Sequence, residues 1–171
     1  MHTINDVLFG IVSYGLSKYL DSRSSKSIRE GLRMTGVAMV NLRPQREYQD
    51  LEEFVRDPKA GWGNKFGMLV LPTYYHRSGS DPLEYLRRAK AMIDQKKSSL
   101  ESYFSYKFGY LIMSILGAKA ITMHMVSYAG TAYMQILVAK DLVHDPEVLA
   151  KCLEDAMLEM KEAALPKIKR K

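Results

Sequence analysis

The sequence predicts an α/β (α+β) domain, in which helices alternate with short strands along the chain. Apolar residues recur at helical spacing in several stretches, short runs rich in valine and methionine have the character of strands, and turn-forming residues separate the two. At 171 residues the chain is long enough for one domain with a hydrophobic core and too short for a second. Hydrophobic residues at 47% and charged residues at 26% argue against a disordered chain.

The first helix is expected to begin at Ile4. Thr3 and Asp6 have the spacing of a cap in which each side chain bonds the other residue's backbone N–H. Apolar residues then recur at spacings of three and four as far as Leu20. The polar run Asp21–Glu30, with four serines, predicts an exposed loop after the helix.

Two strands and a short helix are expected next. Met34–Leu42 is apolar and stops before Pro44, which predicts a strand. Tyr48–Val55 has the pattern of a short helix, and Phe66–Leu71 predicts a second buried strand.

The second long helix has a clear start signal. Asp81, Pro82 and Glu84 supply an N-cap, a proline at the first helical position and an acid in the first turn. We expect a break near Ser98, followed by a further apolar helical segment over Tyr103–Leu116.

The last part of the chain predicts a hairpin and a helix. Ile121–Val126 and Tyr133–Ala139 are apolar runs separated by Gly130, which favours two strands joined by a tight turn. Asp145 and Pro146 then open a helix. Its apolar positions are predicted to form one buried stripe: Val148, Leu149, Cys152, Leu153, Ala156, Met157 and Met160.

The net charge of +6 is concentrated at one end of the chain. Lys161 to Lys171 contain five basic residues and one acid, so the rest of the chain is nearly neutral. We therefore expect a domain over residues 1–165 and a basic tail over residues 166–171, and no nucleic-acid partner. A nucleic-acid function would depend on net charge alone and ranks last.

Four longer segments and two short ones, read in order, carry a resemblance to a known family. They are Thr3–Leu8 (TINDVL), Val40–Pro44 (VNLRP), Trp62–Gly67 (WGNKFG), Asp81–Lys90 (DPLEYLRRAK), Val126–Tyr128 (VSY) and Asp145–Pro146 (DP). On these segments the chain resembles the C-terminal region of the plant wax ester synthase/diacylglycerol O-acyltransferases, the WS/DGAT family.

The resemblance implies the fold of CoA-dependent acyltransferases, a chloramphenicol acetyltransferase-like sandwich. Each half of it has a mixed sheet flanked by helices, and this chain would supply most of the C-terminal half. The resemblance also implies transfer of a fatty acyl group from acyl-CoA, the co-substrate, to a long-chain alcohol or diacylglycerol, with no bound cofactor and no metal. We expect a peripheral protein at the cytosolic face of the endoplasmic reticulum or plasma membrane. The longest uncharged stretch, Phe108–Ala118, is too short to span a bilayer.

The chain departs from the family pattern in two ways. The family's His-His-x-x-x-Asp-Gly motif, which supplies the general base, is absent, because none of the four histidines (His2, His76, His124 and His144) adjoins another. A family block with a Ser-Asn-Val-x-Gly-Pro turn and neighbouring strands is also missing, since Gly117 runs almost directly into Ile121. We therefore predict a truncated domain with an internal deletion, no catalytic residue of its own, and a missing N-terminal catalytic domain as partner.

The resemblance also suggests site residues. It places Asn5 and Asp6 against the substrate channel, a role compatible with capping the first helix. A second set matches family motifs and consists of Asn41, Arg43, Gly63 and Asn64. These residues are expected to hold the strand ends and a crossover loop, and direct contact with CoA is the alternative role.

A basic stretch on the second long helix has two interpretations. Arg87, Arg88 and Lys90 are candidates to contact anionic lipid or the CoA phosphates, and a solvated helix face is the alternative because Glu84 and Asp94 lie nearby. The alternative function for the whole chain is a non-catalytic module that associates with lipid or membrane.

Overall fold

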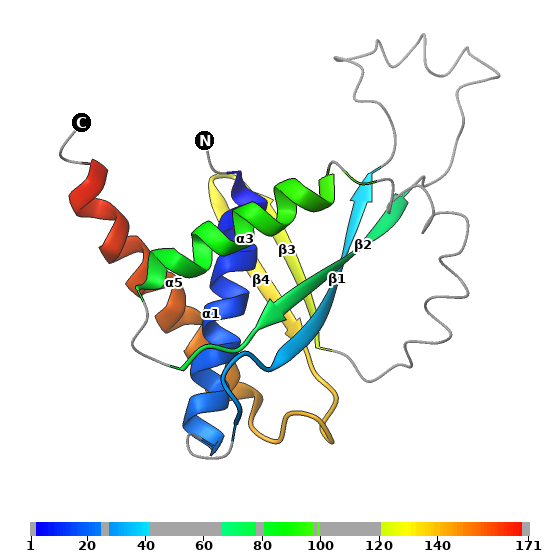
Figure 1. The fold of residues 1–171 in the computed structure, drawn as a ribbon, viewed down its shortest axis with the longest axis vertical. Coiled ribbons are helices and arrows are strands. Elements are labelled where there is room, and N and C mark those ends of the chain that lie inside the picture. The colour runs from blue at the N-terminus through cyan, green and yellow to red at the C-terminus, as the bar shows by residue number, and fades with distance from the viewer. Residues whose placement is uncertain are drawn as a thin grey trace, which may run out of the picture.

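The computed structural model describes residues 3–24, 28–41, 66–77, 81–97, 99 and 121–168 (Figure 1). Within these ranges the elements are, in chain order, α1 (Ile4–Ser24), β1 (Arg33–Asn41), β2 (Phe66–Tyr74), α3 (Pro82–Lys97), β3 (Thr122–Tyr128), β4 (Thr131–Leu137) and α5 (Pro146–Ile168). This mixture of helices and strands confirms the α/β (α+β) class. The predicted helices at Tyr48–Val55 and Tyr103–Leu116 lie outside the described residues.

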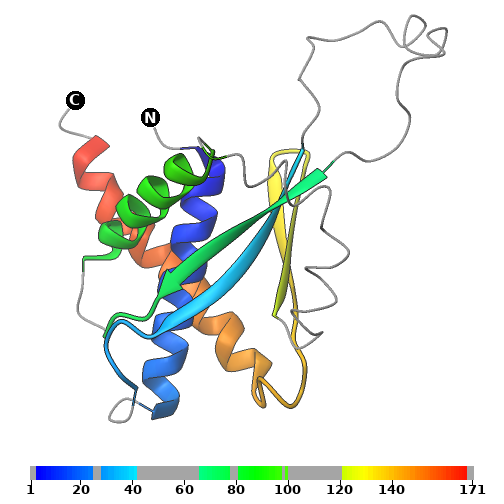
Figure 2. The same cartoon turned by 45° about the vertical axis from the view of Figure 1, so that its right-hand side comes forward.

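The described strands form two separate antiparallel pairs, β1 with β2 and β3 with β4. In Figure 2 α3 and the upper parts of α1 and α5 lie on the left, β3 and β4 lie on the right, and β1 and β2 run diagonally across α1. The continuous mixed sheet of an acetyltransferase-like sandwich stays a prediction, because the described residues contain no pairing between the two sheets.

Two elements extend beyond their predicted ends, and a third ends where it was expected to. α1 continues to Ser24, into the segment expected to be loop, because contacts hold its last turn: Arg23 bonds Asp145 at 2.9 Å and Asp21 accepts a bond from the Tyr75 hydroxyl. β2 extends to Tyr74 because β1 pairs with it along its whole length. α3 ends at Lys97, close to the expected break.

The predicted hairpin is confirmed, and its turn is tighter than the sequence indicated. β3 and β4 are joined through Ala129 and Gly130, with φ of 49° and 78°. Two consecutive residues with positive φ are the hallmark of a type I′ turn, whose twist matches that of the flanking strands. Glycine adopts such a φ at no steric cost, whereas Ala129 does so against its intrinsic preference.

α1 lies at the centre of the core and crosses both other helices at glycines. A Cβ on Gly10 would lie 3.1 Å from the Leu86 Cα of α3, and a Cβ on Gly15 would lie 2.9 Å from the Leu153 Cα of α5. The missing side chains therefore allow the helix backbones to approach closely.

The predicted stripe of α5 is correct at its centre and wrong at its edges. Leu149, Leu153, Ala156 and Met160 are buried against α1, and Cys152 is half-buried. Val148 and Met157, which were expected in the same stripe, are 39% and 48% exposed. The reason is geometric, because the buried residues follow a spacing of three and four that presents one narrow face of the helix to α1.

None of the described helices combines the length and apolar character that a bilayer crossing requires.

Candidate functional site at the N-terminal end of α1

The N-terminus of α1 is capped as the sequence predicted. The Thr3 backbone N–H donates to Asp6 Oδ2 at 2.6 Å, and the Asp6 backbone N–H lies 3.4 Å from Thr3 Oγ1. This reciprocal pair satisfies backbone donors that have no partner inside the helix. It also fixes the position of Asn5, which lies between the two and is exposed.

Asp6 is an unusual capping residue because it is fully buried, with 0% of its surface exposed. Its second oxygen, Oδ1, is buried and has no hydrogen-bond partner within the described parts of the chain. Burial raises the pKa of the Asp6 carboxyl, but the bonds from Thr3 and the positive charges of Lys90 and Lys97 outweigh it, so the pKa lies below its ordinary value. Asp6 is therefore held ionised with spare capacity to accept a hydrogen bond.

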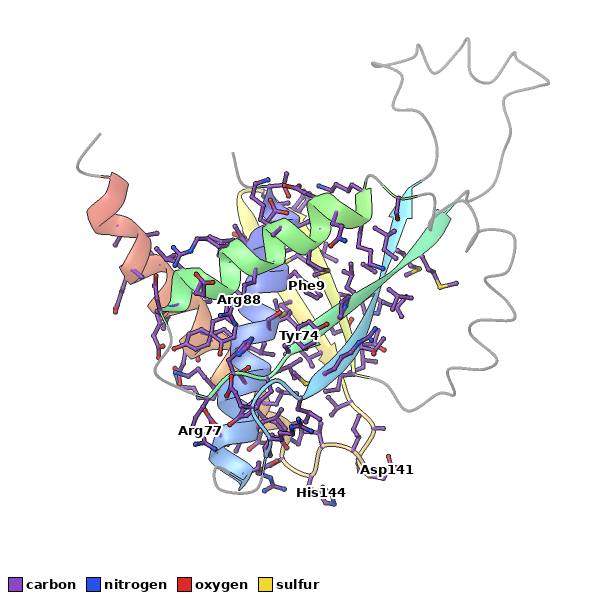
Figure 3. All side chains as sticks on the ribbon, in the orientation of Figure 1. Phe9, Tyr74, Arg77, Arg88, Asp141 and His144 are labelled. Atoms are coloured by element: carbon purple, nitrogen blue, oxygen red, sulfur yellow. The ribbon has the colours of Figure 1, made fainter. Side chains whose placement is uncertain are left out.

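The packing of α1 on α3 brings two of the predicted groups of residues together. Lys90 lies close enough to Asp6 for each to influence the pKa of the other. Arg87 and Arg88 are exposed residues on the N-terminal half of α3, where Figure 3 labels Arg88. Of the three predicted cations, Lys90 is therefore the one whose charge acts on Asp6 at the capped end of α1.

Each of these three cations already has a carboxylate partner. Arg87 bonds Asp81 and Glu84, both at 2.8 Å, Arg88 bonds Glu84 at 3.1 Å, and Lys90 bonds Asp94 at 2.5 Å. The ion pairs follow the α3 backbone at spacings of three, four and six residues. A phosphate that binds here has to compete with these carboxylates for the same cations.

The second predicted set is only partly described. Asn41 is the last residue of β1 and pairs in register with Phe66 of β2. Arg43, Gly63 and Asn64 lie outside the described residues.

The sequence did not predict a set of polar contacts that joins α1 to α5. The Tyr14 hydroxyl donates to Glu159, and the Lys18 ammonium binds the other oxygen of the same carboxylate. Burial raises the pKa of Glu159, yet Lys18 and Tyr14 together hold that pKa below its ordinary value. The pair therefore ties α1 to α5 through one shared, ionised carboxylate.

The arrangement repeats five residues further along α1. The Tyr19 hydroxyl donates to Asp145 at 2.7 Å, and Arg23 binds the same carboxylate at 2.9 Å. The sequence contained a signal for both sites, because each tyrosine precedes a basic residue by four positions and so shares a helix face with it.

Alkaline pH is expected to destabilise the fold. Burial and a hydrogen bond to a carboxylate raise the pKa of both Tyr14 and Tyr19. The hydrogen bond to Asp21 and burial raise the pKa of Tyr75, and burial raises the pKa of Tyr85. A tyrosine whose pKa is raised on folding contributes its full stabilisation below the ordinary tyrosine pKa of about 10, and this stabilisation is lost as the pH rises above that value. Melting temperatures should therefore fall between about pH 10 and about pH 12.

Tyr14→Phe gives the control for this pH dependence. Because phenylalanine has no hydroxyl to ionise, the variant should be less stable than the native chain near neutral pH but lose less stability above about pH 10. Equal alkaline slopes for the two proteins would contradict the assignment.

No group of three or more histidine, cysteine or acidic side chains within the described ranges has the geometry to hold a metal ion.

The comparisons with known proteins identify the class of this domain. The chain is 41% identical over 125 residues to wax ester synthase/diacylglycerol acyltransferase 1 of Arabidopsis thaliana, and 42% identical over 126 residues to acyltransferase 11 of the same plant. Each alignment covers 69% of this chain and 26% of the relative. The chain therefore spans about a quarter of the length of the curated relatives it matches. No solved structure matches it.

A family profile identifies the family and the domain within it to which this chain corresponds. The profile of the WS/DGAT C-terminal domain matches residues 62–122 and 117–161, more than half of the chain, so the chain belongs to this acyltransferase family. The match is split into two segments that overlap over residues 117–122. This is where the sequence analysis placed the missing block, and a gap in the chain relative to the profile would produce such a split.

Proposed function

We propose that this chain is the C-terminal part of an O-acyltransferase that moves a fatty acyl group from acyl-CoA to a long-chain alcohol or diacylglycerol. Membership of the WS/DGAT C-terminal domain family is the observation that carries the proposal. In the reaction the acceptor oxygen attacks the thioester carbonyl, the ester C–O bond forms, and the C–S bond to CoA breaks. The hydroxyl proton passes to a general base and then to the departing thiolate.

The base is proposed to come from a separate N-terminal catalytic domain. The described histidines of this chain are poorly suited to the role, since His76 binds Glu30 through Nδ1 at 2.6 Å and His124 is an exposed strand residue. His2 lies outside the described residues. His144 lies in the loop before α5, at the end of the molecule opposite the capped end of α1 (Figure 3). Among the three histidines that the structure describes, none is therefore a candidate base at the capped end of α1.

Asn5 and Asp6 are proposed to position the acceptor substrate where the two halves meet. The spare oxygen of Asp6 supports this role, because a buried ionised oxygen without a partner is costly unless something supplies a donor. An acceptor hydroxyl is such a donor. Asn41, Arg43, Gly63 and Asn64 are proposed to hold the strand ends and the crossover loop.

Two finer proposals concern location and phosphate binding. The protein is proposed to work as a peripheral protein at the cytosolic face of the endoplasmic reticulum or plasma membrane. Arg87, Arg88 and Lys90 are the proposed contacts for the CoA phosphates or anionic lipid, with the phosphate replacing their present carboxylate partners.

A reconstitution experiment tests the proposal. The chain is mixed with the part of Arabidopsis acyltransferase 1 that lies outside the match, and ester formation is followed with labelled acyl-CoA and a long-chain alcohol. We expect ester from the mixture and none from the added part alone. Absence of ester from a folded, assembled mixture would contradict the proposal.

Asp6→Asn in the same mixture tests the positioning role. Asparagine keeps an oxygen to accept the Thr3 N–H but loses the charge, so the rate should fall by about tenfold or more at a similar melting temperature. Asp155→Asn is the matched control, because it removes a carboxylate from a solvent-accessible ion pair with Lys151. The positioning role is wrong if both variants keep the native rate.

A further inference from the structure

The crossing of α1 and α3 places two charged side chains beside each other. At the crossing a Cβ on Gly10 would lie 3.1 Å from Leu86 Cα, so the two backbones are in contact there. Asp6 precedes Gly10 by four residues and Lys90 follows Leu86 by four, which is about one helical turn in each case. Each side chain therefore lies on the same face of its helix as the residue at the crossing. In Figures 1 and 2 the N-terminal end of α1 and the C-terminal half of α3 lie on the same, upper side of the crossing, so these two faces meet.

Lys90 is held in place by a partner on its own helix. Its ammonium binds Asp94 at 2.5 Å, one turn further along α3, and the Asp94 side chain is 51% exposed. Asp6, in contrast, is fully buried. Lys90 thus has an exposed carboxylate that anchors it and a buried one on which its charge acts. A charge acts more strongly on a buried group, because less water screens the interaction.

The charge state of Asp6 depends on this second helix. Burial raises the pKa of the Asp6 carboxyl, and the bonds from Thr3, followed by the charges of Lys90 and Lys97, lower it. Within the part of the chain that the structure describes, these two lysines are the charged groups that act on Asp6 from α3. A protonated carboxyl donates a hydrogen bond through one oxygen, whereas an ionised one only accepts. Loss of a lysine charge therefore changes what Asp6 can bind.

We propose that Lys90 is a positioning residue of the acyl transfer, whose ammonium keeps the buried Asp6 carboxylate in the charged form that accepts the hydroxyl of the incoming alcohol or diacylglycerol. This inference rests on the proposed function, which gives Asp6 the task of positioning the acceptor. It also gives Lys90 a role that Arg87 and Arg88 do not share, because the α3 charges that act on Asp6 are those of Lys90 and Lys97.

The first test uses the chain alone and measures the pKa of Asp6 by carbon-13 NMR of its carboxyl group. Lys90→Met removes the ammonium and keeps a flexible apolar side chain, so the pKa of Asp6 should rise by about half a pH unit or more. Lys90→Arg keeps the charge and should hold the pKa near its native value. Lys151→Met is the matched control and should leave the pKa of Asp6 unchanged. Lys151 likewise binds an aspartate four residues further on, Asp155 at 3.2 Å, but it lies on α5.

The second test follows ester formation by the reconstituted mixture as a function of pH. A raised pKa means that Asp6 becomes protonated at a higher pH, so the fall of the rate on the acidic side should move upward in Lys90→Met by about half a pH unit or more. Lys90→Arg should restore the native profile, and KM for acyl-CoA should keep its native value in both variants. A residue that only stabilised the fold would lower the rate without moving this profile.

Any of three results would overturn the inference. They are an unchanged pKa of Asp6 in folded Lys90→Met, a raised pKa that leaves the pH profile of the rate unmoved, and a loss confined to KM for acyl-CoA, which would make Lys90 a phosphate contact only. Lys90→Gln gives the same comparison where the methionine variant folds poorly. Absence of ester from the native mixture is a separate outcome, because it contradicts the proposed function, whereas the NMR comparison tests the action of Lys90 on Asp6 by itself.

Discussion

Leu149→Ala is expected to lower the free energy of unfolding by about 2 to 5 kcal/mol, the range for deleting a large side chain from a packed core. Leu149 is completely buried, between Tyr19 of α1, Val143 of the preceding loop and Leu153. Because these neighbours come from three parts of the chain, the surrounding structure has little freedom to collapse into the cavity. Chemical denaturation monitored by circular dichroism measures the loss.

Val148→Ala is the matched control for this prediction. The two residues are adjacent on α5 and were expected in the same stripe, yet Val148 is exposed. Its replacement should change the free energy of unfolding by less than about 0.5 kcal/mol. Comparable losses at the two positions would contradict the orientation of α5 in the structure.

Gly15→Ala is expected to destabilise the fold by about 1 to 3 kcal/mol, although alanine is the better helix former by about 1 kcal/mol. The new Cβ would lie 2.6 Å from Leu153 Cδ2 and 2.9 Å from Leu153 Cα. Rotation of the Leu153 side chain relieves the contact with Cδ2, but the contact with Cα remains because that atom belongs to the backbone of α5. The two helices must therefore move apart, and the core between them loosens.

Gly10→Ala and a double variant complete the test. The Gly10 site is less tight, with Leu86 Cα at 3.1 Å, so its alanine variant should lose less stability. Gly15→Ala combined with Leu153→Ala should lose less than the sum of the two single losses, because Leu153→Ala removes the nearer of the two clashes. An increase in stability with Gly15→Ala would mean that α1 and α5 do not cross at this glycine.

The elements that the sequence predicted are those decided by local chemistry. The Thr3–Asp6 cap, the Asp81–Pro82 helix start and the turn at Gly130 each depend on residues within a few positions of one another. Such signals are readable because the backbone groups that they satisfy are neighbours in the chain.

The features that the sequence did not predict depend on partners far away along the chain. The extra turn of α1 is held by Asp145 and Tyr75, and the choice of Leu149 over Val148 as a core residue depends on how α5 is rotated against α1. The pairing of Tyr14 and Lys18 with Glu159 likewise joins the two ends of the chain. Helical periodicity locates an apolar face but does not set its width or its partners.

The resemblance selected the residues of the candidate site, but it did not predict their electrostatics. Asn5 and Asp6 were selected by resemblance, but the burial of Asp6 and its coupling to Lys90 follow from the crossing of α1 and α3 at Gly10. The basic stretch of α3 was predicted as a phosphate contact or a solvated face, and its ion pairs with Asp81, Glu84 and Asp94 give it the character of the second. A phosphate contact there stays a proposal.

The isolated chain provides the most direct test of the central claim, that this domain works in ester formation only when another domain supplies the base. Purified native chain is incubated with labelled palmitoyl-CoA and hexadecanol, and the wax ester is measured against a protein-free blank. We expect no ester above the blank. Sustained ester formation by the chain alone would contradict it, because the proton acceptor would then have to lie among its own residues.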